Sequence, residues 1–307
     1  MNSLMNDIKL NELLKKIPAL AETKSISVLH GGLTNSNYRV DTNTNTYVIR
    51  KSDKSISLLG INRENERINT ERAWRAGVGA AMIDSLPEEN VLIISWIEAK
   101  TLHAEDIHAQ QELLPRIANA IRKLHAGEKF HRDFYFPSVR KEYLKIVTDN
   151  NYFLPDEYLQ VEHFVIELET ILASNPEELV PCNNDLLAEN FMDDGKKIWI
   201  IDYEYSGQNE ASFEIGNFAN EVSLNDEQLT VLCDFYWQKH LPEKIYRAIA
   251  WSLIAKFGWV MWASIQEGIS AIDFDFRTWG LKKWNAVLPE LKGERYKNII
   301  ENLKKYS

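Results

Sequence analysis

The sequence has few cysteines and no excess of positive charge. Its 307 residues include two cysteines, Cys182 and Cys233, so we expect neither a disulfide scaffold nor a cysteine-rich zinc site. The 45 aspartates and glutamates outnumber the 35 lysines and arginines, which gives a net charge of −10. An acidic chain lacks the clustered cations that bind nucleic-acid phosphates or anionic membrane surfaces, so we expect neither as a partner.

No secretory signal peptide is expected. Residues 1–17 lack a continuous apolar segment and instead have the spacing of an amphipathic helix. Its apolar residues are Ile8, Leu10, Leu13, Leu14 and Ile17. Residues 248–265 are apolar over about one bilayer span, but Lys256 lies in their middle, where a charge is costly in lipid. We interpret them as a buried helix and expect a cytoplasmic protein without stable membrane insertion, whose oligomeric state is open.

Two kinds of hydrophobic pattern divide the chain near residue 98. Before this point, short alternating segments predict strands at 25–29, 37–40, 46–50, 82–83 and 91–96. One polar helix is predicted among them, at 62–76, ending at Gly77. After this point, helical periodicity predicts long helices at 104–125, 156–172, 226–240 and 243–267.

An irregular segment, residues 180–217, interrupts these helices. Within it, Asp194-Gly195 is a favoured two-residue hairpin turn between the apolar residues 191–192 and 198–201. The expected fold class is α+β with two lobes. Residues 1–98 would form a small antiparallel sheet with one long helix. Residues 99–307 would form a larger, mainly helical lobe with an inserted β-hairpin.

The strongest chemical signal lies in this irregular segment. Asp185 and Asn190 are five residues apart in a loop before the first hairpin strand, and Asp202 ends the second strand. Pairing of the two strands would bring Asp202 close to Asn190. Phosphoryl transfer from ATP uses such a set, because one Asp accepts the proton of the attacking hydroxyl while the Asn and the second Asp hold Mg²⁺ against the phosphates. Ordinary turn and capping residues are the alternative.

A second candidate, His131-Arg132-Asp133, has the residue order of the protein-kinase catalytic loop. Five residues after its Asp stands Ser138 instead of Asn, and no hairpin ending in Asp follows. We interpret this segment as a surface or lobe-packing element.

Groups suited to phosphate binding lie in the N-terminal lobe. Residues 30–37, HGGLTNSN, lie between two strands, and Gly31 and Gly32 allow backbone amides to approach phosphate oxygens, although a tight β-turn is the alternative. Arg50 ends an apolar strand, where a cation for the α- and β-phosphates is expected. Its possible ion-pair partners on the next helix are Glu64, Glu66 and Glu71, of which we favour Glu66.

Aromatic residues are concentrated in and after the last predicted helix. They are Trp251, Trp259, Trp262, Phe274, Phe276 and Trp279. A box of aromatic faces holds a quaternary ammonium by cation–π attraction, which contributes roughly 1–2 kcal/mol per ring when the site is desolvated. A well-packed core is the alternative interpretation.

Taken together, these residues make the chain resemble the choline/ethanolamine kinases. This family lies within the wider aminoglycoside phosphotransferase and protein kinase-like superfamily, and the resemblance is greatest to its bacterial choline kinases. The similarity covers roughly residues 25–290. It is carried by HGGLTNSNYRV, TYVIR, INRENERINTERAWRAGV, NNDLLAENF, IDYEYSG, FEIGNFANE and FGWVMWASIQ. The most specific parts are IDYEYSG, followed by IGN and a glutamate, and the WxxW of the late helix.

The resemblance implies a role for each matching position. Asp185 would be the catalytic base, with Asn190 and Asp202 as magnesium ligands. The nucleotide would bind to Gly31, Gly32, Thr34, Asn35, Asn37, Arg50 and Glu66 and to the hinge residues Ser95, Trp96 and Ile97. The substrate would bind to Asp185, Tyr205, Glu221, Trp259, Trp262, Phe276 and Trp279.

The implied reaction is the phosphorylation of choline to phosphocholine, with ATP as co-substrate and Mg²⁺ as cofactor. A kinase for ethanolamine, thiamine or an aminoglycoside is the main alternative, and a catalytically silent binding member of the family is another. Two positions depart from the family pattern. Asn183 replaces the usual His two residues before the catalytic Asp, which permits the silent alternative. The polar residues 223–226 replace an aromatic position of animal members, which leaves the exact amine open.

Overall fold

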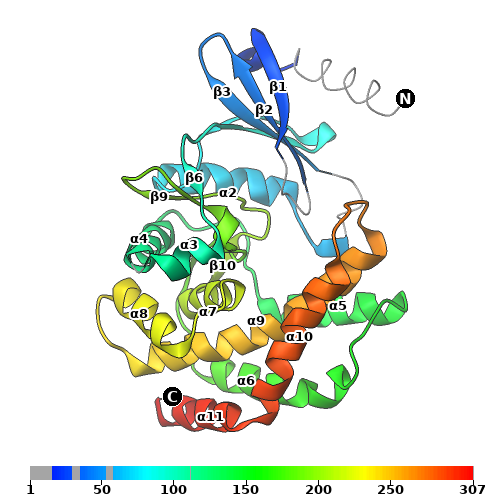
Figure 1. Cartoon of the computed structure of the whole chain (residues 1–307), viewed down its shortest axis with the longest axis vertical. Coiled ribbons are helices and arrows are strands. Elements are labelled where there is room, and N and C mark those ends of the chain that lie inside the picture. Colours follow the sequence, from blue (N-terminus) through cyan, green and yellow to red (C-terminus); the bar gives the residue numbers. More distant parts are fainter. Residues whose placement is uncertain (1–15, 30–34, 53–57, 111, 307) are drawn as a thin grey trace.

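The computed structural model describes residues 16–29, 35–52, 58–110 and 112–306 (Figure 1). Most of the predicted N-terminal helix lies outside these residues, and so do three predicted phosphate-binding residues, Gly31, Gly32 and Thr34. A lobe built on a β-sheet lies at one end of the molecule, and helices make up most of the rest (Figure 1). This arrangement confirms the predicted two-lobed α+β class. The boundary at residue 98 stays a prediction, since β5 ends at Ser95 and β6 begins at Lys100.

The N-terminal lobe is a five-stranded antiparallel sheet in the order β1-β2-β3-β5-β4. Its strands are β1 (Thr23–Leu29), β2 (Asn35–Thr42), β3 (Thr46–Ser52), β4 (Met82–Leu86) and β5 (Val91–Ser95), with the 3₁₀ turns η1 (Pro18–Leu20) and η3 (Pro87–Glu89). Successive side chains of a strand point to opposite faces of the sheet, and here both faces carry apolar side chains. One face packs on Ile17 and Leu20, and the other turns Leu92 and Ile94 toward the hairpin of the larger lobe.

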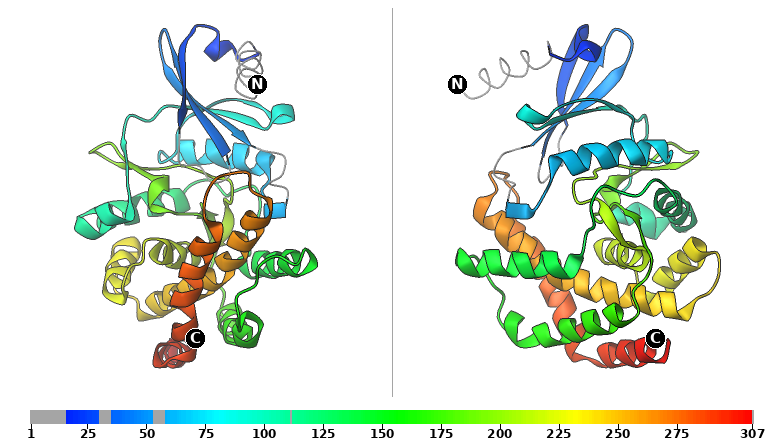
Figure 2. Two further views of the ribbon diagram at one scale, coloured as in Figure 1. Left: turned by 45° about the vertical axis from the view of Figure 1, so that its right-hand side comes forward. Right: turned by 180° about the vertical axis from the view of Figure 1, so that it is seen from behind.

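Helix α2 (Arg63–Arg75) lies between the sheet and the helical lobe (Figure 2). The side chain of Asn62 caps its N-terminus by accepting a hydrogen bond from the backbone N–H of Asn65. Gly77 follows its end with φ of 78°, a conformation that favours glycine. Its buried side chains are mostly polar (Asn65, Glu66, Asn69, Thr70), which places hydrogen-bonding groups between the lobes.

The helical lobe contains α3 (Ala104–Ala109), α4 (Leu113–His125), α5 (Phe136–Asp149), α6 (Tyr158–Ser174), α7 (Ala211–Glu221), α8 (Asp226–Trp237), α9 (Pro242–Ile269), α10 (Phe276–Lys292) and α11 (Glu294–Tyr306). Two small antiparallel sheets lie on top of these helices. One joins β6 (Lys100–Thr101), β8 (Phe191–Asp193) and β9 (Ile198–Ile200), and the other joins β7 (Leu179–Cys182) and β10 (Gly207–Glu210). The 3₁₀ turn η4 (Ala188–Asn190) leads into the predicted hairpin. Its turn is longer than the predicted two residues: Asp193 pairs with Ile198, so residues 194–197, which include Asp194-Gly195, lie between the strands.

The long helix α9 runs through the centre of this lobe. It is long and apolar enough to cross a membrane, but 94% of its most apolar 18-residue window is buried inside the structure. Helices α7 and α10 pack along it. The charge in its middle, Lys256, forms an ion pair with Glu290 of α10 at 2.7 Å. The buried-helix interpretation is therefore confirmed.

Two predicted segments differ from the structure. The helix predicted at 104–125 is two helices, because the backbone of Gln110 is extended and ends α3. The segment predicted to be irregular, 180–217, contains most of α7. Nearly every residue of α7 is buried, its polar residues included, and a glycine and two asparagines lower the helix propensity of this short segment.

Candidate active site

The loop between β7 and β8 and the segment after β9 bring together the three residues predicted for phosphoryl transfer. The side-chain Nδ2 of Asn190 donates a hydrogen bond to the backbone carbonyl of Asp185 at 2.7 Å. The backbone N–H of Ile201 donates to the carbonyl of Asn190 at 2.9 Å, so the end of β9 lies beside the loop. Asp202 follows directly, with φ of 63° in the left-handed region. A non-glycine residue in this region is uncommon and is held there by its surroundings.

Asn183, the residue that replaces the usual His, ties the two halves of this site together. Its Nδ2 donates to the backbone carbonyls of Asp202 at 2.7 Å and Ile201 at 3.2 Å. Its Oδ1 accepts from the backbone N–H of Asp185 at 3.0 Å. The asparagine therefore sets the position of Asp185 relative to Asp202 through three hydrogen bonds.

The Asp185 carboxyl group lies in an acidic and buried environment. Burial raises its pKa well above the usual range, and the carboxylates of Asp202, Glu204 and Glu221 raise it further. The ammonium of Lys283 acts in the opposite direction. A raised pKa makes this carboxylate a stronger proton acceptor at neutral pH.

Arg50 on β3 connects the sheet lobe to this loop. Its guanidinium lies 2.5 Å from an oxygen of Asp202 and 3.4 Å from an oxygen of Glu66 on α2. The structure therefore pairs Arg50 with Glu66. The other two candidate glutamates have different partners, since Glu64 pairs with Arg67 and Glu71 with Arg75.

Glu204 is a buried carboxylate that the sequence did not single out. It accepts a hydrogen bond from Asn35 Nδ2 at 2.9 Å, and the guanidinium of Arg63 lies at 3.4 Å. Burial raises the pKa of Glu204 to about 7, and the nearby Asp202 and Glu66 contribute to the rise. Asn35, predicted to bind phosphate, thus links the sheet lobe to the segment after Asp202. No local pattern reveals this contact, because its partners are 169 positions apart.

A cleft of about 450 Å³ lies between the two lobes. Predicted nucleotide- and metal-binding residues line it: Asn37, Arg50, Ser95, Trp96, Ile97, Asn190 and Asp202. Apolar side chains form its other walls, among them Val48 and Ile94 from the sheet and Met192 and Ile201 from the hairpin. One end of the cleft is therefore polar and reaches Asp202, while the rest suits a flat apolar ring.

The predicted aromatic residues form one connected cluster. Trp262 donates its Nε1–H to the hydroxyl of Tyr205 at 2.8 Å, and its ring lies 5.4 Å from that of Trp279 and 5.8 Å from that of Phe276. Trp259 contacts the ring of Tyr205 edge-on at 5.7 Å. The backbone carbonyl of Tyr205 accepts from Asn184, the neighbour of Asp185. The cluster is therefore attached to the loop that carries Asp185.

Glu221, the last residue of α7, closes this cluster and already has a cationic partner. The Lys283 ammonium lies 2.7 and 2.8 Å from its two carboxylate oxygens. The same ammonium lies 4.2 Å from the ring centroid of Trp279. Sequence analysis did not identify Lys283, because no helix was predicted at 276–292 and nothing in the local sequence marks this lysine as nearly buried.

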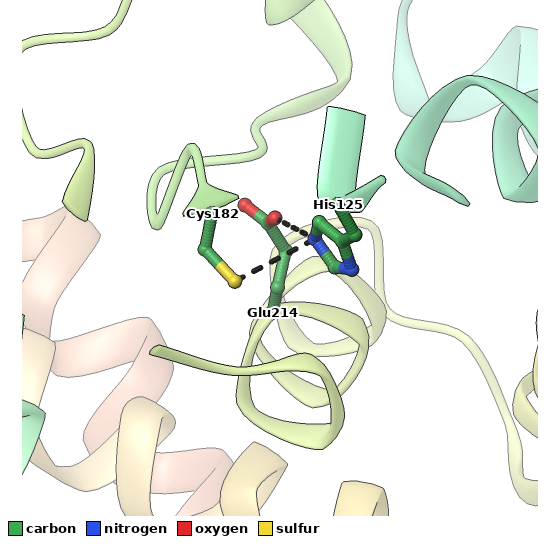
Figure 3. Close-up of side chains that lie close together, drawn as sticks. All are labelled: His125, Cys182 and Glu214. Carbon is green, nitrogen blue, oxygen red and sulfur yellow. Dashed lines mark hydrogen bonds and ion pairs between the residues drawn. The ribbon is translucent and has the colours of Figure 1, made fainter. Parts of the chain in front are cut away.

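A second group of possible metal ligands lies behind the loop. His125 from α4, Cys182 from β7 and Glu214 from α7 point toward one another (Figure 3). Their atoms are already hydrogen-bonded: His125 Nε2 contacts Glu214 at 2.5 Å and its Nδ1 contacts the Tyr236 hydroxyl at 2.7 Å. Burial, with the Glu214 carboxylate nearby, raises the pKa of the Cys182 thiol well above its usual range, which disfavours the thiolate that metals bind.

This group has a structural role. The other carboxylate oxygen of Glu214 accepts from the backbone N–H of Asn184 at 2.7 Å. Asn184 has φ of 66°, so this bond holds an unusual backbone conformation directly before Asp185. The cluster therefore positions the loop from below.

The segment His131-Arg132-Asp133 joins the lobes, and its last two residues line a cavity together with Glu204 and Tyr205. The backbone N–H of Gln208 in β10 donates to the carbonyl of Arg132 at 2.8 Å. The side chain of Asn69 in α2 accepts from the backbone N–H of His131 at 2.9 Å. This is the packing role predicted for the segment.

The donor set of the loop fits a hard cation such as Mg²⁺. Asp185, Asn190 and Asp202 offer carboxylate and amide oxygens, which are the ligands that Mg²⁺ takes in proteins. Asp202 and Glu204 also raise the pKa of Asp185, which means that negative charge is concentrated here. A divalent cation would relieve this repulsion.

Comparison with known proteins shows the family of this chain. A family model for choline/ethanolamine kinases matches residues 26–241. The chain is 24% identical to Protein LicA of Haemophilus influenzae over 85% of this chain and 78% of that protein. It is 26% identical to a probable ethanolamine kinase of Arabidopsis thaliana with the same coverages. The crystal structure of a choline/ethanolamine kinase family protein from Mesorhizobium loti superposes with a TM-score of 0.84 at 27% identity, covering 96% of this chain and 99% of that one.

Proposed function

The chain belongs to the choline/ethanolamine kinase family, and we propose that it transfers the γ-phosphoryl group of ATP to the hydroxyl group of choline in the cytoplasm. Membership of this family makes it a small-molecule kinase. The choice of choline rests on one observation, the connected cluster of Tyr205, Trp262, Trp279 and Phe276 beside the Asp185 loop. Aromatic faces attract a trimethylammonium group, which cannot donate hydrogen bonds.

The proposed nucleotide site is the cleft between the lobes. The apolar walls near Ile94 and Met192 suit the adenine ring, and the hinge Ser95–Ile97 offers backbone groups to it. Arg50 brings positive charge to the polar end, where the phosphates would lie, and Glu66 orients its guanidinium. The family resemblance adds the segment around Gly31, Gly32, Thr34 and Asn37 to the phosphate site.

The proposed chemistry takes place at the polar end of this cleft. Mg²⁺, when bound by Asn190 and Asp202, would neutralise phosphate charge in the transition state. The trimethylammonium would lie against the aromatic cluster, with its charge balanced by Glu221. This would bring the hydroxyl, two carbons away, to Asp185, whose raised pKa suits it to accept the hydroxyl proton. Asn183 and Glu214 would act by positioning, since their contacts are with the loop backbone.

Ethanolamine is the second candidate substrate, and the Glu221 contact favours it. The carboxylate accepts hydrogen bonds from a primary ammonium, that of Lys283, in the structure. The ammonium group of ethanolamine has the same donors. A site with both a carboxylate and ring faces can therefore accept either amine.

The experiment that tests this function is ADP release by the purified protein with ATP and magnesium. Choline, ethanolamine, thiamine and an aminoglycoside would be compared as acceptors. Choline-dependent turnover well above the others supports the proposal. Turnover with ethanolamine alone would replace choline by the second candidate. Absence of turnover with all four, despite ATP binding, would refute both candidates in favour of a silent member or another acceptor.

A further inference from the structure

Glu221 is a nearly buried carboxylate at an unfavourable place for negative charge. It ends α7, where the helix dipole is itself negative, and its side chain is only 6% exposed. A buried carboxylate without a cation is strongly destabilised, so this position requires a positive partner in every state of the protein. In the structure that partner is Lys283, whose side chain is 11% exposed.

The ammonium of Lys283 has the surroundings predicted for the ammonium of the substrate. Both carboxylate oxygens of Glu221 lie within 2.8 Å of it, and the face of Trp279 lies 4.2 Å away. Trp279 is in turn in contact with Trp262, which connects this position to Tyr205. A carboxylate with an aromatic face is the combination that recognises an alkylammonium ion. Two cations cannot share it, because they repel each other at such short distances.

We propose that Lys283 is a tethered ammonium that occupies the substrate's ammonium position in the free enzyme and must leave it before the amine binds. This inference rests on the proposed function, because it concerns how strongly the proposed amine site binds its amine. The lysine side chain has a flexible four-carbon stem, so it can withdraw without a change in the backbone of α10. Withdrawal of the Lys283 ammonium from Glu221 then determines which ligands can bind, because only a ligand that supplies a cation to Glu221 can replace it.

Competition of this kind has a distinctive signature. The apparent affinity for an amine is reduced by the fraction of molecules in which the position is vacant. This factor belongs to the protein alone, so it is the same for every cationic ligand. Replacing Lys283 by methionine, which keeps an unbranched side chain one atom shorter and removes its charge, should therefore strengthen the binding of choline, ethanolamine and tetramethylammonium by one common factor. We expect that factor to be about tenfold or more, because a buried carboxylate left unpaired attracts a cation strongly.

Calorimetric titration with tetramethylammonium chloride tests the inference without depending on catalysis, because this ion has no hydroxyl to phosphorylate. The proteins compared would be the wild type, Lys283→Met and the matched control Lys282→Met, whose lysine is the exposed neighbour on α10. The expected result is binding about tenfold tighter to Lys283→Met alone. Steady-state kinetics should show the same fold decrease in the KM of choline and of ethanolamine, with the KM of ATP unchanged.

The outcomes separate this inference from the proposed function. If the wild type phosphorylates an amine but Lys283→Met binds tetramethylammonium no more tightly, the tethered-ammonium inference is wrong and the proposed function stands. If tetramethylammonium binds more tightly to Lys283→Met but no amine is phosphorylated, the inference stands and the proposed function fails. If Lys283→Met does not fold, Lys283→Gln, which keeps a polar end group, replaces it in the titration. It should bind tetramethylammonium about tenfold more tightly than the wild type, and unchanged binding would refute the inference.

Discussion

Replacing Asn183 by alanine would show whether this residue does the work of the histidine that the family usually has. The substitution removes three hydrogen bonds of three partly buried backbone groups: the carbonyls of Ile201 and Asp202 and the N–H of Asp185. At about 1 kcal/mol net for each bond, the free energy of unfolding should fall by about 3 kcal/mol. For a protein of this size the melting temperature should fall by about 6 °C.

The loss of activity should be larger than the loss of stability suggests. Asn183 sets the distance between Asp185 and the segment of Asp202, and a displacement of about 1 Å in a catalytic group costs about 100-fold in rate. We therefore expect kcat to fall about 100-fold at a temperature where the variant is fully folded. Asn183→His, which restores an N–H donor, should recover part of this loss.

ADP release measures the rate, and thermal unfolding measures the stability. Asn119→Ala is the control, because Asn119 is exposed on α4 and should change neither quantity measurably. A lower melting temperature with an unchanged kcat would mean that the three bonds only stabilise the fold. An unchanged value of both would refute the argument, since it would show that the bonds make no net contribution.

Three further substitutions test other parts of the structure. Asp185→Asn should lower kcat by about 1,000-fold, and a retained rate would reject Asp185 as the base. The melting temperature should not fall, because burial raises the pKa of this carboxyl group, which means that its negative charge opposes folding at neutral pH. Trp262→Leu removes one ring and should raise the KM of choline about tenfold with little change in the KM of ATP; equal changes in both would mean that the aromatic cluster is not the amine site. Gly216→Ala should lower the free energy of unfolding by about 3 kcal/mol, because the new methyl group would overlap the backbone carbonyl of Ala248 where α7 crosses α9. Chemical denaturation measures this change, and an unchanged midpoint would show that the two helices separate easily.

Local patterns predicted the strands of the larger sheet and α2, but not every element with a side facing water, since α5, α10 and α11 were not predicted. β3 nearly alternates, β5 is recognisable as a short run of apolar residues, and α2 has a polar side and an Asn cap. The patterns also failed at α7, which is buried almost all round, because Gly216 and two asparagines lower the helix propensity of its 11 residues and only tertiary packing compensates. The same burial explains why Gly216, unfavourable in an isolated helix, is suited to this one: it allows α9 to approach closely.

The site was predicted in part for a different physical reason. Asp185, Asn190 and Asp202 could be found because a hairpin brings near neighbours in the chain together, and its turn can be recognised from two residues. Glu204, Glu214 and Lys283 could not, because their contacts join residues 30 to 169 positions apart. Contacts of this range depend on how whole helices pack, which no local pattern records.

The five residues Asp202–Ser206 show why one short motif nevertheless carried so much information. Asp202 contacts Arg50, and Glu204 contacts Asn35 and Arg63, so these acidic side chains face the sheet lobe. Tyr205 instead contacts Trp262 in the aromatic cluster. The backbone of the segment is held from the other side, by Asn183 at Asp202 and by Asn184 at Tyr205. Asp202 and Glu204 thus meet the sheet lobe and Tyr205 meets the aromatic cluster, so a change at any of these three should disturb the contact between the proposed nucleotide site, the loop and the proposed amine site. This short segment therefore joins the parts on which the proposed mechanism depends, whereas most of the long helix α9 contributes to the core.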